Sequence, residues 1–404
     1  MDDARTPMSF GERVEFFRKR AGMTRKVLGE LCGRSEEWVK ALEKGRLLMP
    51  RVPLLVRLAE VLEVGDLAEL TGEQRLTTAT YGKARHEKAD EIARALVSYP
   101  LVCGDREPVP AAELAASVRQ AWMVWHGSAH QRTAVAAVLP RLLSDARTSA
   151  RLLEGRERRS ALASLAQVYH LVQLYLAFQP VPGLVMLAGD RAMQAAQDAD
   201  DPHAIAAAAW YMNHVYREAG EQAEARLELA HQVAGLLRPD ASETDRALWG
   251  LQQLAIALSL ARTGRKGEAE HHFDLAGRAA DALTAHHPWL LFGRAMVDAY
   301  AITIYADLAD AHEATRQADR TDLSKLPSAT RRSFHLIETA RAYHLKREPL
   351  AAVHLLNRAY EISPETIGFN LFARSAVQEL MVSGGPTVRE DARELAGKLR
   401  LPAA

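Results

Sequence analysis

Loop-like segments recur at a nearly constant spacing from about residue 180 onward, and this recurrence limits the fold more than any other feature. The segments lie near positions 180, 220, 264, 309 and 347 and read QPVPG, AGEQAEA, TGRKGEA, LADAHEA and LKREPLAA. Each lies between two runs in which Ala, Leu, Arg and Glu recur at three- and four-residue spacing, which is typical of amphipathic helices. A period of roughly 40 residues predicts stacked helical hairpins, because one hairpin cannot bury its own apolar face.

The rest of the chain also predicts helices. Strands that alternate apolar and polar residues around Asn-Gly or Asp-Gly turns are missing, and the run AIAAAA at 204–209 suits closely packed helices. The 404 residues are enough for more than one core. We therefore expect an all-α protein with short N-terminal helices in 1–75, a helical linker in 76–110, and a helical-repeat domain in 111–404.

Composition narrows the class of protein. Hydrophobic residues make up 48% and charged residues 25% of the chain, as in ordinary globular proteins, and the formal net charge is zero. The whole molecule is therefore not a general binder of polyanions. Cys32 and Cys103 lie far apart, which favours a reducing compartment over a disulfide scaffold. The start MDDARTPMSF is not a signal peptide, and no stretch approaches the ~18 apolar residues of a membrane helix. We expect a cytoplasmic protein without a membrane partner.

One repeat unit has a recognisable pattern. Residues 333–364, SFHLIETARAYHLKREPLAAVHLLNRAYEISP, resemble the tetratricopeptide repeat. Its small, aromatic and helix-ending positions are occupied by Ala340, Tyr343, Ala352, Leu356, Ala359 and Pro364. The unit around TGRKGEAEHHFDLAGRA matches through Ala257, Gly264, Ala269, Phe273 and Ala276. The period exceeds the usual ~34 residues of that repeat, so an α-solenoid of another class stays open.

Residues 9–72 predict five short helices. We expect the first to bury Val14 and Phe17, and the second, RKVLGELC, to bury Val27, Leu28 and Leu31.

The helix boundaries follow from turn and cap residues. Thr24 and Ser35 suit N-caps, Gly33 suits the turn between the second and third helices, and Gly45 suits the end of the third. Pro53 is tolerated in the first turn of the fourth helix.

This arrangement resembles the lambda-repressor-like helix-turn-helix domain of the Xre family. The resemblance rests on Thr24, Leu28, Leu31, Gly33, Ser35, Val39, Glu43, Gly45 and the run at 55–64. In that fold the third helix enters the major groove and the N-terminus of the second contacts the DNA backbone. The resemblance implies DNA contacts by Thr24, Arg25, Lys26, Ser35, Glu37, Lys40, Ala41, Lys44, Arg46 and Arg51. Arg25 and Lys26 would face phosphates, and the face opposite Trp38 would read bases.

Two carboxylates complicate the third helix, in the stretch GRSEEWVKALEKGR at 33–46. Glu36 and Glu37 complement the helix dipole in the first turn, and a carboxylate can also accept a hydrogen bond from cytosine N4. Both roles stay open for Glu37, whereas the dipole role is favoured for Glu36. Residues 1–72 carry 13 basic and 12 acidic side chains, so one copy should hold DNA weakly. We therefore expect a homodimer on a double-stranded DNA operator.

The combined architecture resembles two groups of transcriptional regulators. One group is the peptide-sensing regulators of Gram-positive quorum sensing. The other is the actinobacterial Xre-type regulators with helical-repeat C-termini, which phrases such as EGRERRSALASLAQVYHL resemble more closely. The resemblance implies transcriptional control, with the repeats serving dimerisation, ligand sensing or both.

Polar side chains interrupt the Ala- and Leu-rich repeats at two places. Alignment to the tetratricopeptide pattern puts these side chains on the concave surface, where Arg and Asn suit the carboxylate and backbone of a peptide. A signalling peptide or small-molecule effector is expected there, and hydrogen bonds within the solenoid are the alternative. The residues are Trp210, Asn213, His214 and Arg217 in one helix, and Arg341 and His344 in another.

Catalytic signatures are missing from the sequence. It contains no GxxxxGK[ST], GxSxG or HExxH motif. The paired histidines at 271–272 and 286–287 lack partners at metal-ligand spacing. We expect neither enzyme activity nor a metal or cofactor. Two functions stay open: a ligand-gated DNA-binding regulator, and a protein-interaction scaffold or adaptor that regulates a partner without binding an operator.

Overall fold

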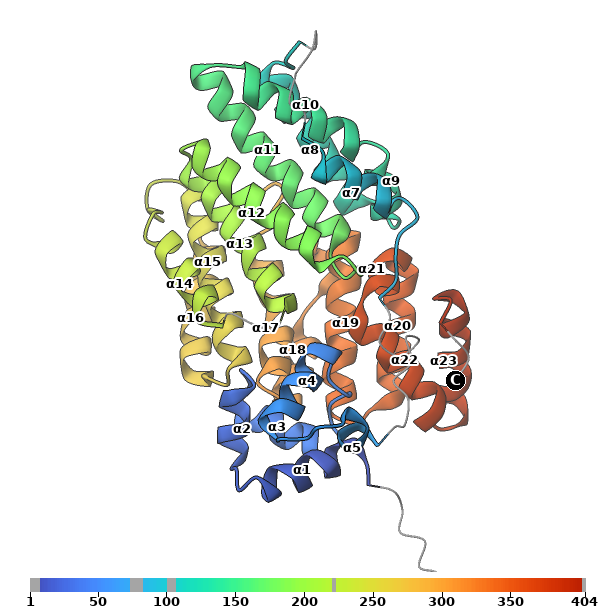
Figure 1. Cartoon of the computed structure of the whole chain (residues 1–404). Helices are drawn as coiled ribbons and strands as arrows, with labels where there is room; N and C mark the ends of the chain where they lie inside the picture. The colour runs from blue at the N-terminus through green and yellow to red at the C-terminus, as the bar shows by residue number, and fades with distance from the viewer. Residues whose placement is uncertain (1–7, 73–82, 100–106, 220–222, 402–404) are drawn as a thin grey trace, which may run out of the picture.

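The computed structural model describes residues 8–72, 83–99, 107–219 and 223–401. Within these ranges the chain forms helices and no strand, which confirms the all-α prediction. None of the helices found there is both long and apolar enough to cross a membrane. Short N-terminal helices lie against one end of a larger stack of helices (Figure 1).

The five short helices form the N-terminal unit. They are α1 (Phe10–Arg20), α2 (Arg25–Leu31), α3 (Glu36–Glu43), α4 (Val52–Val61) and α5 (Leu67–Thr71). Val14 and Phe17 are buried in its core, as predicted, with Leu28, Val39 and Leu42. Trp38 is half-buried and packs against the same core.

The predicted caps and turns of the N-terminal unit are confirmed. Thr24 Oγ1 accepts a hydrogen bond from the Val27 amide at 3.2 Å, and Ser35 Oγ accepts one from the Trp38 amide at 3.0 Å. Gly33 has φ +63°, in the left-handed region that favours glycine, and so turns the chain from α2 into α3.

The buried face of α2 differs from the prediction. Leu28 is fully buried, but Val27 and Leu31 are 41% and 45% exposed. Val27 and Leu31 are four residues apart and therefore share one face of the helix. At about 100° per residue along a helix, Val27 is turned by about 100° and Leu31 by about 60° from Leu28, so their shared face is turned away from the core.

The repeats consist of helix pairs that meet at the predicted loops. The pairs are α11 (Gly155–Leu176) with α12 (Pro182–Asp198), α13 (Pro202–Ala219) with α14 (Ala223–Ala234), α15 (Glu243–Arg262) with α16 (Lys266–Asp281), α17 (Arg294–Asp307) with α18 (Ala311–Arg320), and α19 (Ala329–Leu345) with α20 (Pro349–Ile362). Four of the five predicted loops lie between the two helices of a pair, which confirms the hairpin prediction for these pairs. The fifth, near position 220, includes residues 220–222 and lies partly outside the described residues. The first helices of successive pairs contact each other, so they form one continuous row.

Further helices extend the stack at both ends. They are α7 (Ala89–Val97), α8 (Ala111–Gly127), α9 (Gln131–Ala136), α10 (Leu139–Leu152), a short 3-10 helix (Leu323–Lys325), α21 (Pro364–Phe369), α22 (Leu371–Ser383) and α23 (Pro386–Lys398). Ile92 and Leu96 of α7 belong to the main apolar core. Arg147 donates to the Leu96 carbonyl at 2.7 Å, so α7, within the predicted helical linker 76–110, is packed onto α10. Residues 76–82 and 100–106 of that linker lie outside the described residues.

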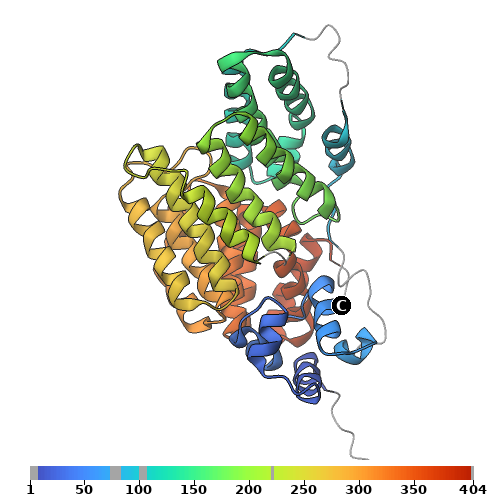
Figure 2. The ribbon, with the colours of Figure 1, turned by 60° about the vertical axis from the view of Figure 1, so that its left-hand side comes forward.

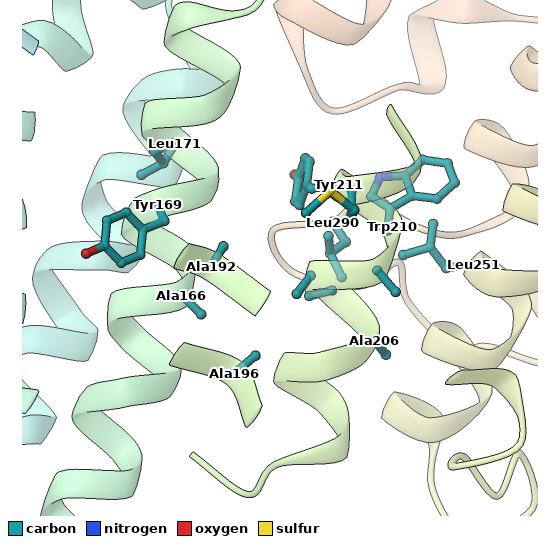
Figure 3. Packing of buried hydrophobic residues seen from close by; sticks show 14 of the residues in the cluster. Ala166, Tyr169, Leu171, Ala192, Ala196, Ala206, Trp210, Tyr211, Leu251 and Leu290 are labelled. Atoms are coloured by element: carbon teal, nitrogen blue, oxygen red, sulfur yellow. The ribbon is translucent and has the colours of Figure 1, made fainter. Parts of the chain in front are cut away.

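Alanine lets the repeat helices approach closely around a few large side chains. Ala206 and Ala209 are fully buried, and the neighbouring Trp210 and Tyr211 are each 1% exposed. Figure 3 shows Trp210 and Tyr211 among the buried side chains, with Leu251 and Leu290 nearby. The row of first helices is therefore held by a dense apolar core.

Candidate DNA-reading surface and ligand site

Glu43, the last residue of α3, links three helices of the N-terminal unit. Its carboxylate accepts hydrogen bonds from Arg18 Nε of α1 at 2.5 Å and from Arg25 Nε of α2 at 2.6 Å. The Glu43 side chain is fully buried, and Arg18 is 7% exposed. Arg18 also donates to the Met23 carbonyl at 2.8 Å. This network fixes the orientation of α3 relative to α1 and α2.

The network corrects the predicted placement of Arg25. We expected its guanidinium to face DNA phosphates, but its side chain is 27% exposed and turned toward Glu43. A second carboxylate, Glu15, lies 3.7 Å away. The reason is that a half-buried cation gains more from two fixed carboxylates than from solvent. Lys26 is exposed in the first turn of α2, the position that meets the DNA backbone in helix-turn-helix folds.

The other predicted DNA contacts separate by exposure. Ala41 is 6% exposed and Ser35 is 5% exposed. The prediction of an open reading face at Ala41 is therefore wrong in this structure, because α3 is buried over a wide arc that also includes Val39 and Leu42. The exposed members of the set are Thr24, Lys26, Glu37, Lys40, Lys44, Arg46 and Arg51.

The N-terminal unit lies against one end of the repeats (Figure 2). Contacts on the repeats are made by the turns on either side of α3. A methyl group added to Gly264, in the α15–α16 turn, would lie only 2.3 Å from Ser35 Cβ. Arg347, in the α19–α20 turn, donates a hydrogen bond to the Lys44 carbonyl oxygen. Leu48 packs against the apolar cluster formed by α19–α23. Contacts on both sides of α3 therefore hold it against the repeats.

A cavity of about 710 Å³, here the junction cavity, lies between α3 and the repeats. Glu37 and Arg46 line it from the N-terminal unit, and Lys266, Lys346 and Arg347 line it from the repeats. The sequence offered Glu37 a dipole role and a base-contacting role. The structure adds a third, because this carboxylate shares the cavity with basic side chains of the repeats.

Two of the predicted ligand-binding residues lie in the core instead. Trp210 is 1% exposed and packs edge-on against the rings of His214 and Tyr300, at centroid distances of 4.6 and 5.9 Å. Asn213 is 5% exposed, and its Nδ2 donates to the Ala209 carbonyl one turn earlier at 3.2 Å. Both side chains are buried in the dense row, so neither presents a surface to a ligand. His214 is half-buried, and burial lowers its pKa well below the usual value.

Arg217 and Arg341, far apart in sequence, meet at one carboxylate. Asp307 Oδ2 pairs with Arg217 at 2.5 Å, and its Oδ1 pairs with Arg341 at 2.8 Å. Glu338 lies 3.3 Å from the other nitrogen of Arg341. The two guanidiniums hold the pKa of the Asp307 carboxyl well below its usual range, against the opposing effect of burial. His344 lies apart from this group and pairs with Glu379 at 3.8 Å.

Three more arginines belong to this group and were not singled out from the sequence. Arg34 comes from the α2–α3 turn, Arg226 from α14 and Arg262 from the end of α15. Arg34 interacts electrostatically with Asp307 and with Arg217, although it belongs to the N-terminal unit. Arg34, Arg217, Arg226, Arg262 and Arg341 are named the arginine cluster below. Arg262 shares with Arg217 and Arg341 a place near the end of a first helix, which was a signal in the sequence, whereas Arg34 and Arg226 carried no such signal.

Two adjacent histidines of α16 lie close to a third histidine in α14. His271 and His272 are adjacent rings 5.3 Å apart, with His231 5.5 Å from His272. The described part of the chain contains no group of three His, Cys, Asp or Glu side chains arranged for a metal ion.

Comparison with known proteins identifies the N-terminal unit. Residues 9–71 match the family model described as a helix-turn-helix domain. No curated protein matches the chain in sequence. Among solved structures, the chain is similar to ComR from S. thermophilus, determined in complex with DNA and its signalling peptide ComS. The identity is 11%, the match covers 88% of this chain and 99% of that chain, and the TM-score is 0.26. With an identity and a TM-score this low, no binding site of ComR is assigned to this chain.

The exposure of Lys26 and the pairing of Arg25 lead to a prediction for DNA binding. Lys26→Ala should reduce the slope of log Kd against log salt concentration by about one, because one phosphate contact and its released counterion are lost. Arg25→Ala should leave that slope unchanged, because its charge is already paired with Glu43. Binding titrations at four salt concentrations measure both slopes. An unchanged slope for Lys26→Ala would show that Lys26 does not contact a DNA phosphate.

Proposed function

We propose that the chain is a sequence-specific DNA-binding transcriptional regulator whose helical repeats control access to α3. The observation that carries this proposal is that the turn leading into the third helix of a helix-turn-helix unit is packed against the repeats. A major groove is about 12 Å wide and receives the N-terminal part of this helix. Ser35 at that end is buried against Gly264, so α3 must leave the repeats before it can enter a groove.

The charge of the N-terminal unit supports binding as a homodimer. Its 13 basic side chains are nearly balanced by 12 acidic ones in residues 1–72, and Arg18 and Arg25 are paired inside the unit. One copy therefore attracts phosphates weakly. Two copies on one operator double the phosphate contacts and add base contacts at a second half-site.

Gating by a peptide or small molecule at the repeats completes the proposal. Arg217 and Arg341 converge at the same end of the stack where the N-terminal unit docks. A ligand there changes contacts to both parts. Its effect on DNA affinity is limited to the difference between its affinities for the docked and undocked shapes.

Selection from random duplex DNA tests the function. Full-length protein and the full-length Gly264→Asn variant, designed to undock, are each incubated with a pool of randomised duplexes. We expect enrichment of a two-fold symmetric site with half-sites about 10 bp apart or a multiple of that. A chain in which the exposed Lys26, Lys40 and Lys44 are changed to Glu is the control and should enrich nothing. Failure of both proteins to enrich any sequence refutes the proposal.

The second candidate is a scaffold or adaptor that regulates a protein partner. One observation favours an adaptor. The segment that includes α3 already makes contacts within the protein, through Arg347 and Leu48. The same selection separates the two functions, since an adaptor enriches no DNA site.

A further inference from the structure

The row of first helices brings charged side chains to one end of the stack. Arg217, Arg262 and Arg341 lie in the last or next-to-last turns of α13, α15 and α19, and Asp307 is the last residue of α17. Successive helices of this row contact each other, and the pairing of Arg217 and Arg341 with Asp307 shows that the carboxyl ends of α13, α17 and α19 converge. Cations are favoured there, since each helix end carries roughly half a negative charge.

The N-terminal unit adds a fourth arginine to this end. Arg34 immediately precedes Ser35, which touches Gly264, two residues beyond Arg262. Its charge interacts with Asp307, Arg217 and Arg341. Arg226 of α14 interacts with Arg34, Arg217 and Asp307. The arginine cluster therefore spans the contact between the N-terminal unit and the repeats.

Positive charge exceeds negative charge in the cluster. Among the residues described, Asp307 and Glu338 are the carboxylates within ion-pair distance of any of the five arginines. Arg226 is 3% exposed, and its buried Nε has no hydrogen-bond partner in the described structure. Burial lowers the pKa of Arg34 to about 10 and that of Arg226 to about 9, so both are still charged at neutral pH.

A buried guanidinium nitrogen without a partner, such as Arg226 Nε, is costly, because its hydration is lost and nothing replaces it. Arg217 and Arg341 keep 17% and 24% of their side chains exposed, so the cluster is reachable from solvent. A compact anion with several oxygens satisfies several guanidinium forks at once, and arginine forms two parallel hydrogen bonds to a phosphate.

We propose that a phosphate-bearing small molecule binds in the arginine cluster and holds the N-terminal unit on the repeats. The ligand receives hydrogen bonds from Arg34 on one side and from Arg226 and Arg262 on the other, and thus bridges the two parts. The effect of this ligand on DNA binding rests on the proposed function. The existence of the binding site does not depend on that function. Five arginines share two carboxylates, and this excess of positive charge favours a multiply charged phosphate over a single carboxylate.

The direction of the effect follows from linkage. A ligand that contacts Arg34 only in the docked shape stabilises that shape, and so opposes DNA binding. Operator DNA must in turn weaken ligand binding by the same factor. The site is therefore one for an inhibitory anion rather than an activating one.

Calorimetry on the full-length chain tests the site without DNA. The probes are inorganic phosphate, pyrophosphate and adenosine triphosphate, and citrate serves as a polycarboxylate of comparable charge. Arg262→Gln is the main variant, because Arg262 lies within ion-pair distance of no carboxylate among the described residues, and Asp307 keeps its ion pairs with Arg217 and Arg341. Arg34→Gln tests the contribution of the N-terminal unit. Arg246→Gln, at the other end of α15 and also half-buried, is the matched control.

We expect at least one phosphate probe to bind one site per chain. Arg262→Gln and Arg34→Gln should weaken that binding at least tenfold, and Arg246→Gln should not. The probe that binds with the highest affinity shows whether the natural ligand is free phosphate or a phosphorylated metabolite. Absence of binding by all three probes at millimolar concentration overturns the proposal, as does equal or tighter binding of citrate. Wild-type affinity in both cluster variants places the anion elsewhere and also overturns it.

A second measurement tests the direction with the DNA selected above, at constant ionic strength. Saturating phosphate ligand should weaken DNA binding by wild type and leave Arg262→Gln unaffected. Tighter DNA binding in the presence of the ligand contradicts the bridging role. If the chain binds no DNA at all, the proposed function fails, but the calorimetric result still decides the site.

Discussion

Gly264→Asn should raise the operator affinity of the full-length chain about 5- to 150-fold, the usual range for coupling between sites. Gly264 has φ +81°, and a Cβ there would lie 2.3 Å from Ser35 Cβ. Asn tolerates the left-handed conformation better than other side chains, so the turn survives. Its side chain then occupies the place of Ser35 and pushes the N-terminal unit from the repeats. Fluorescence anisotropy with the selected duplex measures the gain.

The control for this experiment is Gly155→Asn. Gly155 also has positive φ, at +52°, but has no atom near its added Cβ, so the variant carries the backbone cost without the clash. Arg347→Ala, which removes the hydrogen bond to the Lys44 carbonyl, should shift affinity in the same direction as Gly264→Asn by a smaller factor. Equal operator affinity in wild type and Gly264→Asn, with both chains folded by circular dichroism, would show that docking does not restrain DNA binding.

Glu43→Ala should destabilise the N-terminal unit by about 3–5 kcal/mol, the typical cost of removing one partner of a buried ion pair. Arg18 is 7% exposed, and in this variant it loses the carboxylate with which it pairs. Arg25 loses its nearest carboxylate as well. Hydrogen exchange of the α1–α3 amides, followed by mass spectrometry on the full chain, measures the loss. DNA binding should disappear, while exchange in α11–α20 stays as in wild type.

Glu30→Ala is the matched control for this loss. Glu30 is an exposed glutamate of the same unit, and surface changes of this kind usually stay within about 0.5 kcal/mol. The double variant Arg18→Met with Glu43→Leu should recover much of the stability, because a buried ion pair can often be replaced by apolar side chains of similar size. Wild-type exchange rates in Glu43→Ala would mean that the network adds little to stability.

Local signals predicted the helical class and much of the N-terminal unit correctly. The spacing of apolar residues and the loop-like segments predicted the hairpins, because a helix repeats its faces every 3.6 residues wherever it lies. Thr24, Ser35 and Gly33 predicted the caps and the turn, since capping depends on atoms within three or four residues. The match of residues 9–71 to the helix-turn-helix family model agrees with the resemblance seen in those residues.

Exposure was less predictable, even within short helices. Val27 and Leu31 are apolar and correctly spaced, yet they face away from the core. The repeat pattern predicted that Trp210 lies on the concave surface and faces a ligand, yet its side chain is buried in the core. A residue's position on a helix follows from the sequence, but the face that becomes buried depends on which neighbouring helix arrives there.

The sequence by itself determined the helices, their pairing across short loops and the turn into α3, because these depend on contacts between residues close in the chain. Only the tertiary structure decided the partners of Arg25, the meeting of Arg217 and Arg341 on Asp307, and the cover that Gly264 places over Ser35. These pairs lie far apart along the chain. Their contact depends on how successive hairpins stack and where the N-terminal unit docks, which is set by the summed packing of many side chains rather than by any local pattern.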